Sequence, residues 1–394
     1  MRRLLSTMAL ALGGLAAAVP AAAADATQGV SATEIVVGTI QDLSGPLAGY
    51  GKPARNGLQM RVDEINEAGG LRGRKLRLVV EDNGYDPKKA LLAAQKLSSD
   101  DKVFAILSHI GTAANMAAMP IQFERNVINF VPLTGARQMF DPFHRLKFAF
   151  ATPYYDQMRV MLPQLVKEKG AKKVGVIYQD DEYGLEVLRG AETGLKGIGM
   201  QVVEKTSFKR GATDFSSQMA KLSAAGCDLV VLGTIIRETV GSMAEARKIG
   251  FNPIFVGPSA LYSHLVHALG GKAVEGLYGI HTVAHPYADE ESKPVAAWAA
   301  RYKARFNEDP TVFSVYGYAA MDMFAKAADK AGANLTTDSF INVMENTVFP
   351  PDMFGSPEFR VTKTNRLGTN EARLSQVQNG RWKVIGKYVE VRPD

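Results

Sequence analysis

The chain has 394 residues, a formal net charge of +6 and one cysteine. Charges of both signs are scattered along it, without the basic stripe that nucleic-acid binding uses, so we expect no nucleic-acid partner. The single cysteine, Cys227, excludes a disulfide framework, so the fold must rest on its hydrophobic core.

Residues 1–24 have the composition of a secretory signal peptide. Arg2 and Arg3 precede an apolar, alanine-rich run from Leu4 to Val19, and small residues at 22–24 offer a cleavage site. The run is too short for a transmembrane helix, and no later apolar run approaches the roughly 18 residues that one needs. We therefore expect cleavage after Ala24 and a soluble, exported protein that is long enough for two α/β lobes.

Strands and helices alternate from residue 34 to residue 131. The strand EIVVGTI, residues 34–40, leads through a loop ending at Tyr50 and Gly51 into a helix that runs from Pro53 to about Gly69. Proline suits a first helical turn, where its missing N–H costs nothing. Three more strands are expected in this segment, at Leu76–Glu81, Val103–Leu107 and Val127–Val131.

The same order of elements repeats from residue 172. The strand KKVGVIY leads through a loop ending at Tyr183 and Gly184 into a helix that stops near Gly197. Strands then follow at Met200–Phe208, Leu229–Gly233 and Ile254–Gly257. The alternation predicts two parallel sheets with right-handed crossovers. Two lobes of one plan predict a cleft between them, where a small molecule binds.

The pattern changes after Gly276. One extended strand, GLYGIHTV, precedes two helices at Glu290–Phe306 and Ser314–Ala331, and short strands follow from about Phe354. We expect these last strands to return to the second lobe, with chain crossings near residues 151, 278 and 355 that form a three-stranded hinge. Lobe I then comprises residues 33–150 with 279–355, and lobe II comprises residues 151–278 with 356–394.

Candidate ligand-binding residues follow the carboxyl ends of the predicted strands, where ligands bind in open α/β sheets. Gly111 and Thr112 stand directly before a helix, whose free N–H groups and positive dipole end attract anions. Thr134 and Gly135 add a hydroxyl and a backbone donor, so a carboxylate could bind without a cationic side chain. On its own, Thr112 could equally serve only as a helix cap.

Patterns for catalysis, metals and cofactors are weak. The turn around Tyr50 resembles a dinucleotide-binding turn, but it lies too far beyond its strand. Ser99 and Lys102 match Ser-x-x-Lys without the companion motifs of that enzyme class. His264 and His267 lack a nearby acidic or cysteine ligand. We therefore expect no enzyme, no metal and no cofactor, and a hydrolase is disfavoured for want of a nucleophile–base pair.

Four segments carry a family resemblance: IVVGTIQDLSGPLAGYG, INEAGGLRGRKLRLVVEDNGYDPKKA, VGVIYQDDEYG and GPSA. Through them the chain resembles the periplasmic solute-binding proteins of the branched-chain amino acid ABC transporter family. The resemblance implies an α/β fold of two Rossmann-like lobes with parallel-sheet cores, joined by three crossovers, which is the type I periplasmic binding fold. It also implies a periplasmic protein that closes on its ligand like a hinged trap and docks on a membrane permease.

The resemblance places the family's carboxylate-binding hydroxyl on Thr112 and a second carboxylate contact on residues 133–135. It places two cleft tyrosines on Tyr50 and Tyr183, each of which supplies an apolar wall with a polar tip. The expected ligand-binding residues are Tyr50, His109, Gly111, Thr112, Leu133, Thr134, Gly135, Tyr155, Tyr183, Ile235 and Ser259.

Two of these positions depart from the family. Amino-acid binders place an acid where this chain has Ser259, and a tyrosine where it has Ile235. An unpaired buried ammonium costs several kcal/mol, so an amino acid would fit only if another acid reaches in. The tyrosines that could surround a ring are Tyr50, Tyr154, Tyr155, Tyr183 and Tyr262. The acids that could reach the ammonium are Asp156, Asp181 and Glu238.

The sequence therefore predicts a monomeric receptor that captures an aromatic or hydrophobic organic acid without an α-amino group for an ABC importer. A branched-chain amino acid binder of the same class remains an alternative. A ligand-sensing domain of the same fold is another.

Overall fold

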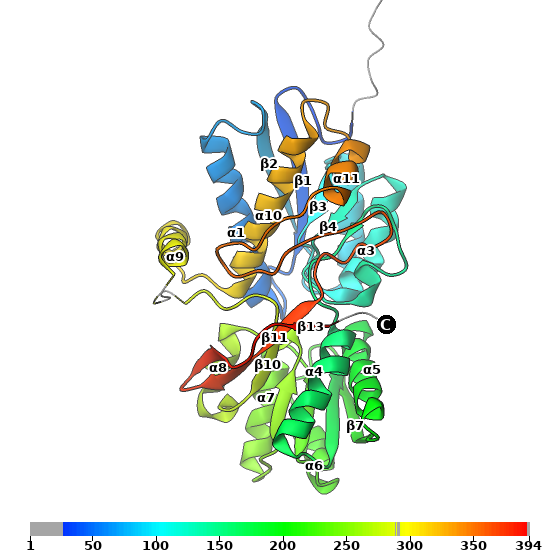
Figure 1. Ribbon diagram of the computed structural model, residues 1–394, viewed down its shortest axis with the longest axis vertical. Coiled ribbons are helices and arrows are strands. Elements are labelled where there is room, and N and C mark those ends of the chain that lie inside the picture. The colour runs from blue at the N-terminus through cyan, green and yellow to red at the C-terminus, as the bar shows by residue number, and fades with distance from the viewer. Residues whose placement is uncertain (1–26, 288, 290–291, 392–394) are drawn as a thin grey trace, which may run out of the picture.

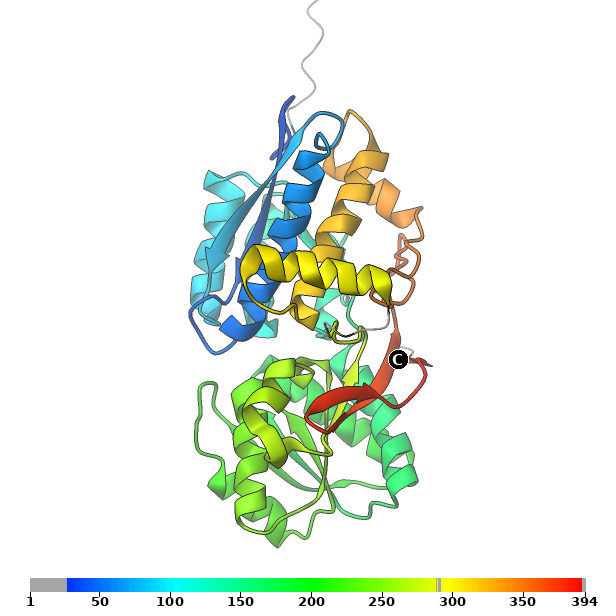
Figure 2. The ribbon, with the colours of Figure 1, turned by 90° about the vertical axis from the view of Figure 1, so that its left-hand side faces the viewer.

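The computed structural model describes residues 27–287, 289 and 292–391, so the expected signal peptide at residues 1–24 lies outside the described residues. Within these ranges no helix is long and apolar enough to cross a membrane. The chain forms two α/β lobes, one above the other in Figures 1 and 2. This architecture confirms the predicted fold class.

The upper lobe is built on a parallel five-stranded sheet with the order β2-β1-β3-β4-β5. Its strands are β1 (Glu34–Gln41), β2 (Lys75–Asp82), β3 (Ala105–Leu107), β4 (Ile128–Phe130) and β5 (Lys147–Phe148). Its first three helices are α1 (Ala48–Glu67), α2 (Pro87–Gln95) and α3 (Thr112–Glu124). β1 is almost entirely buried, which fits a central strand covered on both faces.

The lower lobe holds an eight-stranded sheet with the order β12-β11-β10-β9-β8-β6-β7, and β13 pairs with β11. Its strands are β6 (Val174–Gln179), β7 (Val202–Phe208), β8 (Leu229–Gly233), β9 (Ile254–Gly257), β10 (Tyr278–His281), β11 (Glu371–Gln378), β12 (Arg381–Val384) and β13 (Val389–Glu390). Its helices are α4 (Tyr154–Lys169), α5 (Glu182–Gly197), α6 (Ser216–Ala224), α7 (Ile236–Lys248) and α8 (His264–Gly270). The order β7-β6-β8-β9 matches β2-β1-β3-β4 of the upper lobe, as the repeated sequence pattern predicts.

Three later helices return to the upper lobe: α9 (Lys293–Phe306), α10 (Val312–Ala331) and α11 (Thr337–Glu345). The predicted start of α9 at residue 290 lies outside the described residues. α10 begins two residues before the predicted Ser314, because Thr311 and Ser314 form a capping box. α11 was not predicted, although Thr336 and Ser339 cap it in the same way.

Helix α1 also begins earlier than expected, at Ala48 rather than at Pro53. The carboxylate of Asp42 accepts hydrogen bonds from the N–H groups of Gly45 and Leu47, which fixes the turn into the helix. α10 packs directly on α1, because Gly57 and Gly317 let the two backbones approach closely. A side chain at either position would collide with the backbone of the other helix.

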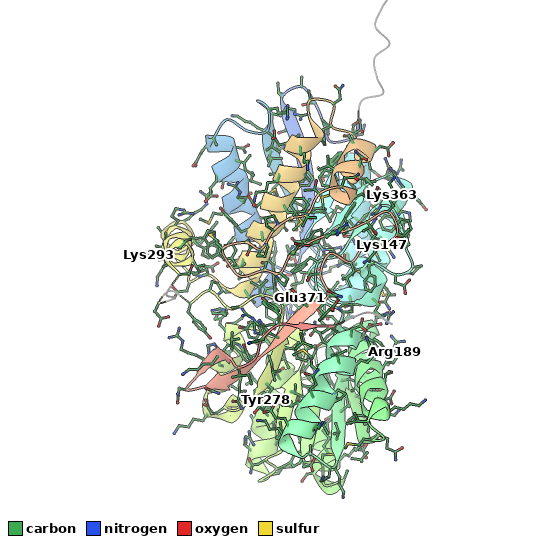
Figure 3. The ribbon with its side chains drawn as sticks, viewed as in Figure 1. Lys147, Arg189, Tyr278, Lys293, Lys363 and Glu371 are labelled. Atoms are coloured by element: carbon green, nitrogen blue, oxygen red, sulfur yellow. The ribbon has the colours of Figure 1, made fainter. Side chains whose placement is uncertain are left out.

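The chain passes between the lobes three times, and two of these crossings lie later in the chain than expected. β10 pairs with β9 at residues 278 and 279 and with β11 through residue 281, so residue 278 lies well inside the lower lobe (Figure 3). Phe359 and Val361 pack in the core of the upper lobe, whereas Glu371, which starts β11, lies at the junction (Figure 3). We therefore propose lobe boundaries after His281 and between Leu367 and Glu371.

Candidate ligand-binding site

A small cavity, here called the central hollow, lies where the strand-end loops of the two lobes meet. Its volume is about 40 Å³, enough for one or two water molecules. The upper lobe lines it with Leu47, Tyr50, Tyr85, Ile110, Gly111, Thr112, Leu133, Thr134 and Phe313, and the lower lobe with Tyr154, Tyr183, Ile235 and Ala260. Hydrogen bonds also join the two lobes around this cavity, so the cleft is closed.

Two threonine hydroxyls form the polar centre of the central hollow. Thr112 is the first residue of α3, and its Oγ1 lies 2.7 Å from Oγ1 of Thr134. Both side chains are buried, and Thr134 Oγ1 also accepts a hydrogen bond from the N–H of Ala136 at 3.3 Å. The hydroxyl of Thr112 is thus directed to Thr134 rather than to capping α3, which has no side-chain cap within the described residues.

Gly111 gives the cavity access to the first turn of α3. Its φ of 95° is in the left-handed region that favours glycine. A side chain here would also press against Tyr85, because a Cβ at this position would stand 3.0 Å from the nearest ring carbon. Backbone N–H groups of a first helical turn have no partner within the helix, so they attract an anion placed beside the two hydroxyls.

Aromatic rings from both lobes surround the two hydroxyls. The ring of Tyr50 stacks on Phe313 with 3.9 Å between centroids, and its hydroxyl donates to the carbonyl of Ala260 across the cleft at 2.8 Å. Tyr183 donates to the carbonyl of Thr234 at 2.8 Å and packs edge-on against Tyr154. Burial raises the pKa of Tyr50 and of Tyr183 well above the ordinary value, so both phenols are neutral donors.

Most of the expected ligand-binding residues gather at this place. Seven line the central hollow: Tyr50, Gly111, Thr112, Leu133, Thr134, Tyr183 and Ile235. Gly135 and Ser259 line a neighbouring cavity of about 30 Å³, here called the side hollow, which shares Leu133, Thr134, Tyr154, Ala260 and Phe313 with the central one. The amide of Gln157 holds Ser259, accepting from its N–H at 2.8 Å and donating to its hydroxyl at 3.0 Å.

His109 and Tyr155 line neither hollow within the described residues. His109 is fully buried, and burial lowers its pKa to about 3, so the ring is neutral. Tyr155 donates to Thr193 on α5 at 3.2 Å, away from the cleft. A helix turns by roughly 100° per residue, so α4 presents Tyr154 to the cleft and turns its neighbour outward.

Sequence reasoning missed Tyr85 and Phe313 as lining residues. Tyr85 crosses the cleft into a clamp formed by Arg210 of the lower lobe. The guanidinium lies 4.6 Å from the ring centroid of Tyr85, donates to its carbonyl at 3.1 Å and pairs with Asp181 at 2.7 Å. The amide of Gln179 donates to the Tyr85 hydroxyl at 3.1 Å. The only sequence signal for Phe313 is the capping box that starts α10.

The three acids that could reach an ammonium group differ in their partners. Asp156 pairs with Arg159, and Asp181 pairs with Arg210. Glu238 is 1% exposed, and neither carboxylate oxygen has a hydrogen-bond partner within the described ranges. Burial raises the pKa of Glu238, whereas the nearby backbone N–H groups and the charge of Arg237 act in the opposite direction. Its charge acts on Tyr50, but its side chain does not line the central hollow.

Tyr262 does not join the ring of tyrosines either. It stacks on His281 in the lower lobe, with 4.2 Å between centroids, and accepts from the N–H of His285 at 3.1 Å. The aromatic wall of the central hollow therefore consists of Tyr50, Tyr85, Tyr154, Tyr183 and Phe313.

Comparisons with known proteins agree with this architecture. The family described as periplasmic binding protein matches residues 34–381. The leucine-, isoleucine-, valine-, threonine- and alanine-binding protein of Pseudomonas aeruginosa is 27% identical over 310 residues, which cover 78% of this chain and 81% of that protein.

Two solved structures share the fold. A fatty acid ABC transporter substrate-binding protein from Thermomonospora curvata superposes with a TM-score of 0.84 at 24% identity, over 92% of this chain and 94% of that one. A solute-binding protein of an ABC transporter from R. palustris, in complex with benzoate, has a TM-score of 0.78 at 19% identity, over 90% and 96% of the two chains. These are binding proteins rather than enzymes, which confirms that expectation. The chain belongs to the periplasmic binding protein family.

Proposed function

We propose that this protein is the periplasmic substrate-binding component of an ABC importer and captures a hydrophobic or aromatic organic acid that lacks an α-amino group. The observation that carries the proposal is the pair of buried hydroxyls, Thr112 and Thr134, at the start of α3 inside an aromatic wall. Neutral donors at a helix N-terminus stabilise a carboxylate, and the rings around them stabilise an apolar body.

The ligands named for the relatives support a carboxylate group in the ligand, but they do not single out one compound. The Pseudomonas relative is named for aliphatic amino acids, the R. palustris structure holds benzoate, and the Thermomonospora protein is named for fatty acids. All three kinds of ligand carry a carboxylate group. The rest of the ligand must then be selected by residues that differ among the binders.

Two residues of the cleft favour an acid over an amino acid as the ligand. Ile235 and Ser259 stand where the resemblance implies a tyrosine and an acid, and Ser259 is already held by Gln157. Glu238 is the remaining candidate for an ammonium contact in the described residues, since both its oxygens lack a partner there. The alternative of an amino-acid binder therefore requires Glu238 to turn toward the ligand when the lobes open.

Capture requires the lobes to open, because the central hollow is too small for a whole ligand. An engineered apolar cavity that binds benzene has a volume of roughly 150 Å³, and the central hollow measures about 40 Å³. We infer that the ligand enters an open form, displaces the Thr112–Thr134 hydrogen bond and selects a closed form around itself.

A calorimetric and thermal-unfolding panel tests the proposal. Benzoate and cyclohexanecarboxylate are compared with benzamide, which lacks the charge, and with leucine and valine. Free ligand at 100 times its Kd should stabilise the protein by about 2.7 kcal/mol. We expect benzoate and cyclohexanecarboxylate to stabilise the protein, and benzamide, leucine and valine to have no such effect. Stabilisation by leucine but by neither acid would favour the amino-acid alternative. A second experiment separates import from sensing: uptake of a bound acid is compared between cells with and without the gene.

A further inference from the structure

A third cavity continues the row that begins at the central hollow. This hinge hollow has a volume of about 100 Å³, larger than either of the other two. It shares Phe150, Thr282 and Tyr316 with the side hollow, so these residues form a common wall. Because the side hollow in turn shares five residues with the central one, the three cavities lie in a row from the paired threonines into the upper lobe.

The hinge hollow is a mainly apolar pocket that opens toward solvent at one side, where Asp322, Lys326 and Asp352 lie. Ala319 and Met323 line it from α10, and Phe349 lines it from the segment after α11. Lys326, also in its lining, pairs with Asp322 at 2.7 Å and is 67% exposed, which marks the solvent side.

The common wall consists of aromatic edges that can separate. Phe150 and Tyr316 meet edge-on with 5.0 Å between centroids, and Tyr316 meets Phe313 in the same way at 5.7 Å. Phe313 also lines the central and side hollows. Rings in edge contact leave a narrow passage when one of them rotates, and such a passage suits a chain better than a ring.

We propose that the ligand is a carboxylic acid with an extended apolar tail, whose carboxylate binds at Thr112 and Thr134 and whose tail passes Phe150 and Tyr316 into the hinge hollow. The proposal rests on the proposed function, since it uses the same carboxylate site. It narrows the preferred ligand to acids with a flexible chain, because only such a tail would reach the hinge hollow from the carboxylate site, whereas a ring acid would occupy the carboxylate site alone.

The position of the hinge hollow links the tail to lobe movement. Phe150 belongs to the first crossing between the lobes, Thr282 to the second and Thr369 to the third, and all three line the cavity. A tail in this space therefore contacts every segment that must bend when the lobes close.

Calorimetry with straight-chain acids from butanoate to decanoate tests the inference. We expect the affinity to rise roughly threefold to fourfold for each buried methylene and then to level off once the hinge hollow is filled. Ala319→Phe, which fills that cavity, should leave the affinity for butanoate within twofold of the wild type and abolish the rise for the longer acids. Met323→Trp fills the same cavity from the next helical turn and serves as a second variant if Ala319→Phe folds poorly.

Controls separate this inference from the function on which it rests. Ala304→Phe adds the same ring to an exposed position on α9 and should bind every acid as the wild type does. If short acids bind but affinity does not change with chain length, or if both cavity-filling variants bind decanoate normally, the extended tail is wrong and the carboxylate site stands. If neither benzoate nor any chain acid binds, the proposed function itself fails.

Discussion

The buried hydroxyls of Thr112 and Thr134 form a hydrogen bond with each other, with 2.7 Å between their oxygens. When a carboxylate binds, two hydrogen bonds to it would replace the bond between the two neutral hydroxyls. This replacement costs little net free energy, because charge-assisted hydrogen bonds are roughly twice as strong as neutral ones. The two hydroxyls that we propose as carboxylate donors are therefore hydrogen-bonded to each other in the closed cleft. Burial of an unsatisfied pair would instead cost about 1–3 kcal/mol for each group.

Replacement of Thr112 tests this exchange at the level of one atom. Thr112→Val keeps the shape of the side chain and removes the hydroxyl, so the affinity for a carboxylate ligand should fall by about 1–3 kcal/mol, measured by isothermal titration. Thr112→Ser retains the hydroxyl and should remain within a few-fold of the wild type. Equal affinities for all three proteins would show that Thr112 does not contact the ligand.

At the scale of elements, the loop between β2 and α2 meets the loops after β6 and β7 across the cleft. The guanidinium of Arg210 covers the ring of Tyr85, donates to its carbonyl at 3.1 Å and pairs with Asp181, which also caps α5. The clamp joins the two lobes, and Arg210 itself does not line the central hollow within the described residues. It therefore stabilises the closed form whatever ligand is inside.

Removal of the clamp should weaken binding of every ligand to a similar degree. Arg210→Ala eliminates a cation–π contact worth about 0.5–2 kcal/mol, so we expect the affinity to fall by that amount. The fall should arise from a higher dissociation rate, which stopped-flow measurements report. Lys209→Ala removes a neighbouring exposed charge and should have no such effect. A loss confined to one ligand class would assign Arg210 to recognition rather than to closure.

At the scale of the whole molecule, the two lobes bury several histidines that the sequence scatters along the chain. His109 lies in the loop that follows β3 in the upper lobe and His281 ends β10 in the lower lobe, and both are fully buried. Burial lowers the pKa of each to about 3. Neither ring is protonated while the protein is folded at neutral pH.

The stability of the protein should therefore depend on pH below neutrality. A histidine titrates near pH 6.5 in an unfolded chain, so between pH 6.5 and about 3 the unfolded chain binds protons that the folded rings do not. The free energy of unfolding should be largest above pH 6.5 and decrease with falling pH, by at most about 1.4 kcal/mol per pH unit for each of these two histidines. Urea unfolding from pH 7 to pH 5 measures this slope.

The slope in a His109→Gln variant provides the comparison, whatever its absolute stability. It should be smaller than that of the wild type by the contribution of one proton. An identical slope would mean that His109 is protonated in the folded protein or does not titrate in the unfolded chain.

The repeated order of strands and helices is determined by local patterns, and so are the positions of the paired threonines. Parallel strands place their carboxyl ends at one edge of a sheet, so residues that follow β3 and β4 must meet there wherever the rest of the chain lies. This is why Thr112, Thr134, Tyr50 and Tyr183 could all be placed at the cleft from the sequence.

Long-range packing decided the remaining features. Phe313 reaches the cleft because α10 returns from the far part of the chain and lies against α1, a contact that no local pattern encodes. Tyr154 rather than Tyr155 faces the ligand site, since the rotation of α4 is fixed by its packing on α5. The crossings after His281 and before Glu371 depend on which sheet accepts each strand, and only the assembled sheets supply the backbone partners that settle it.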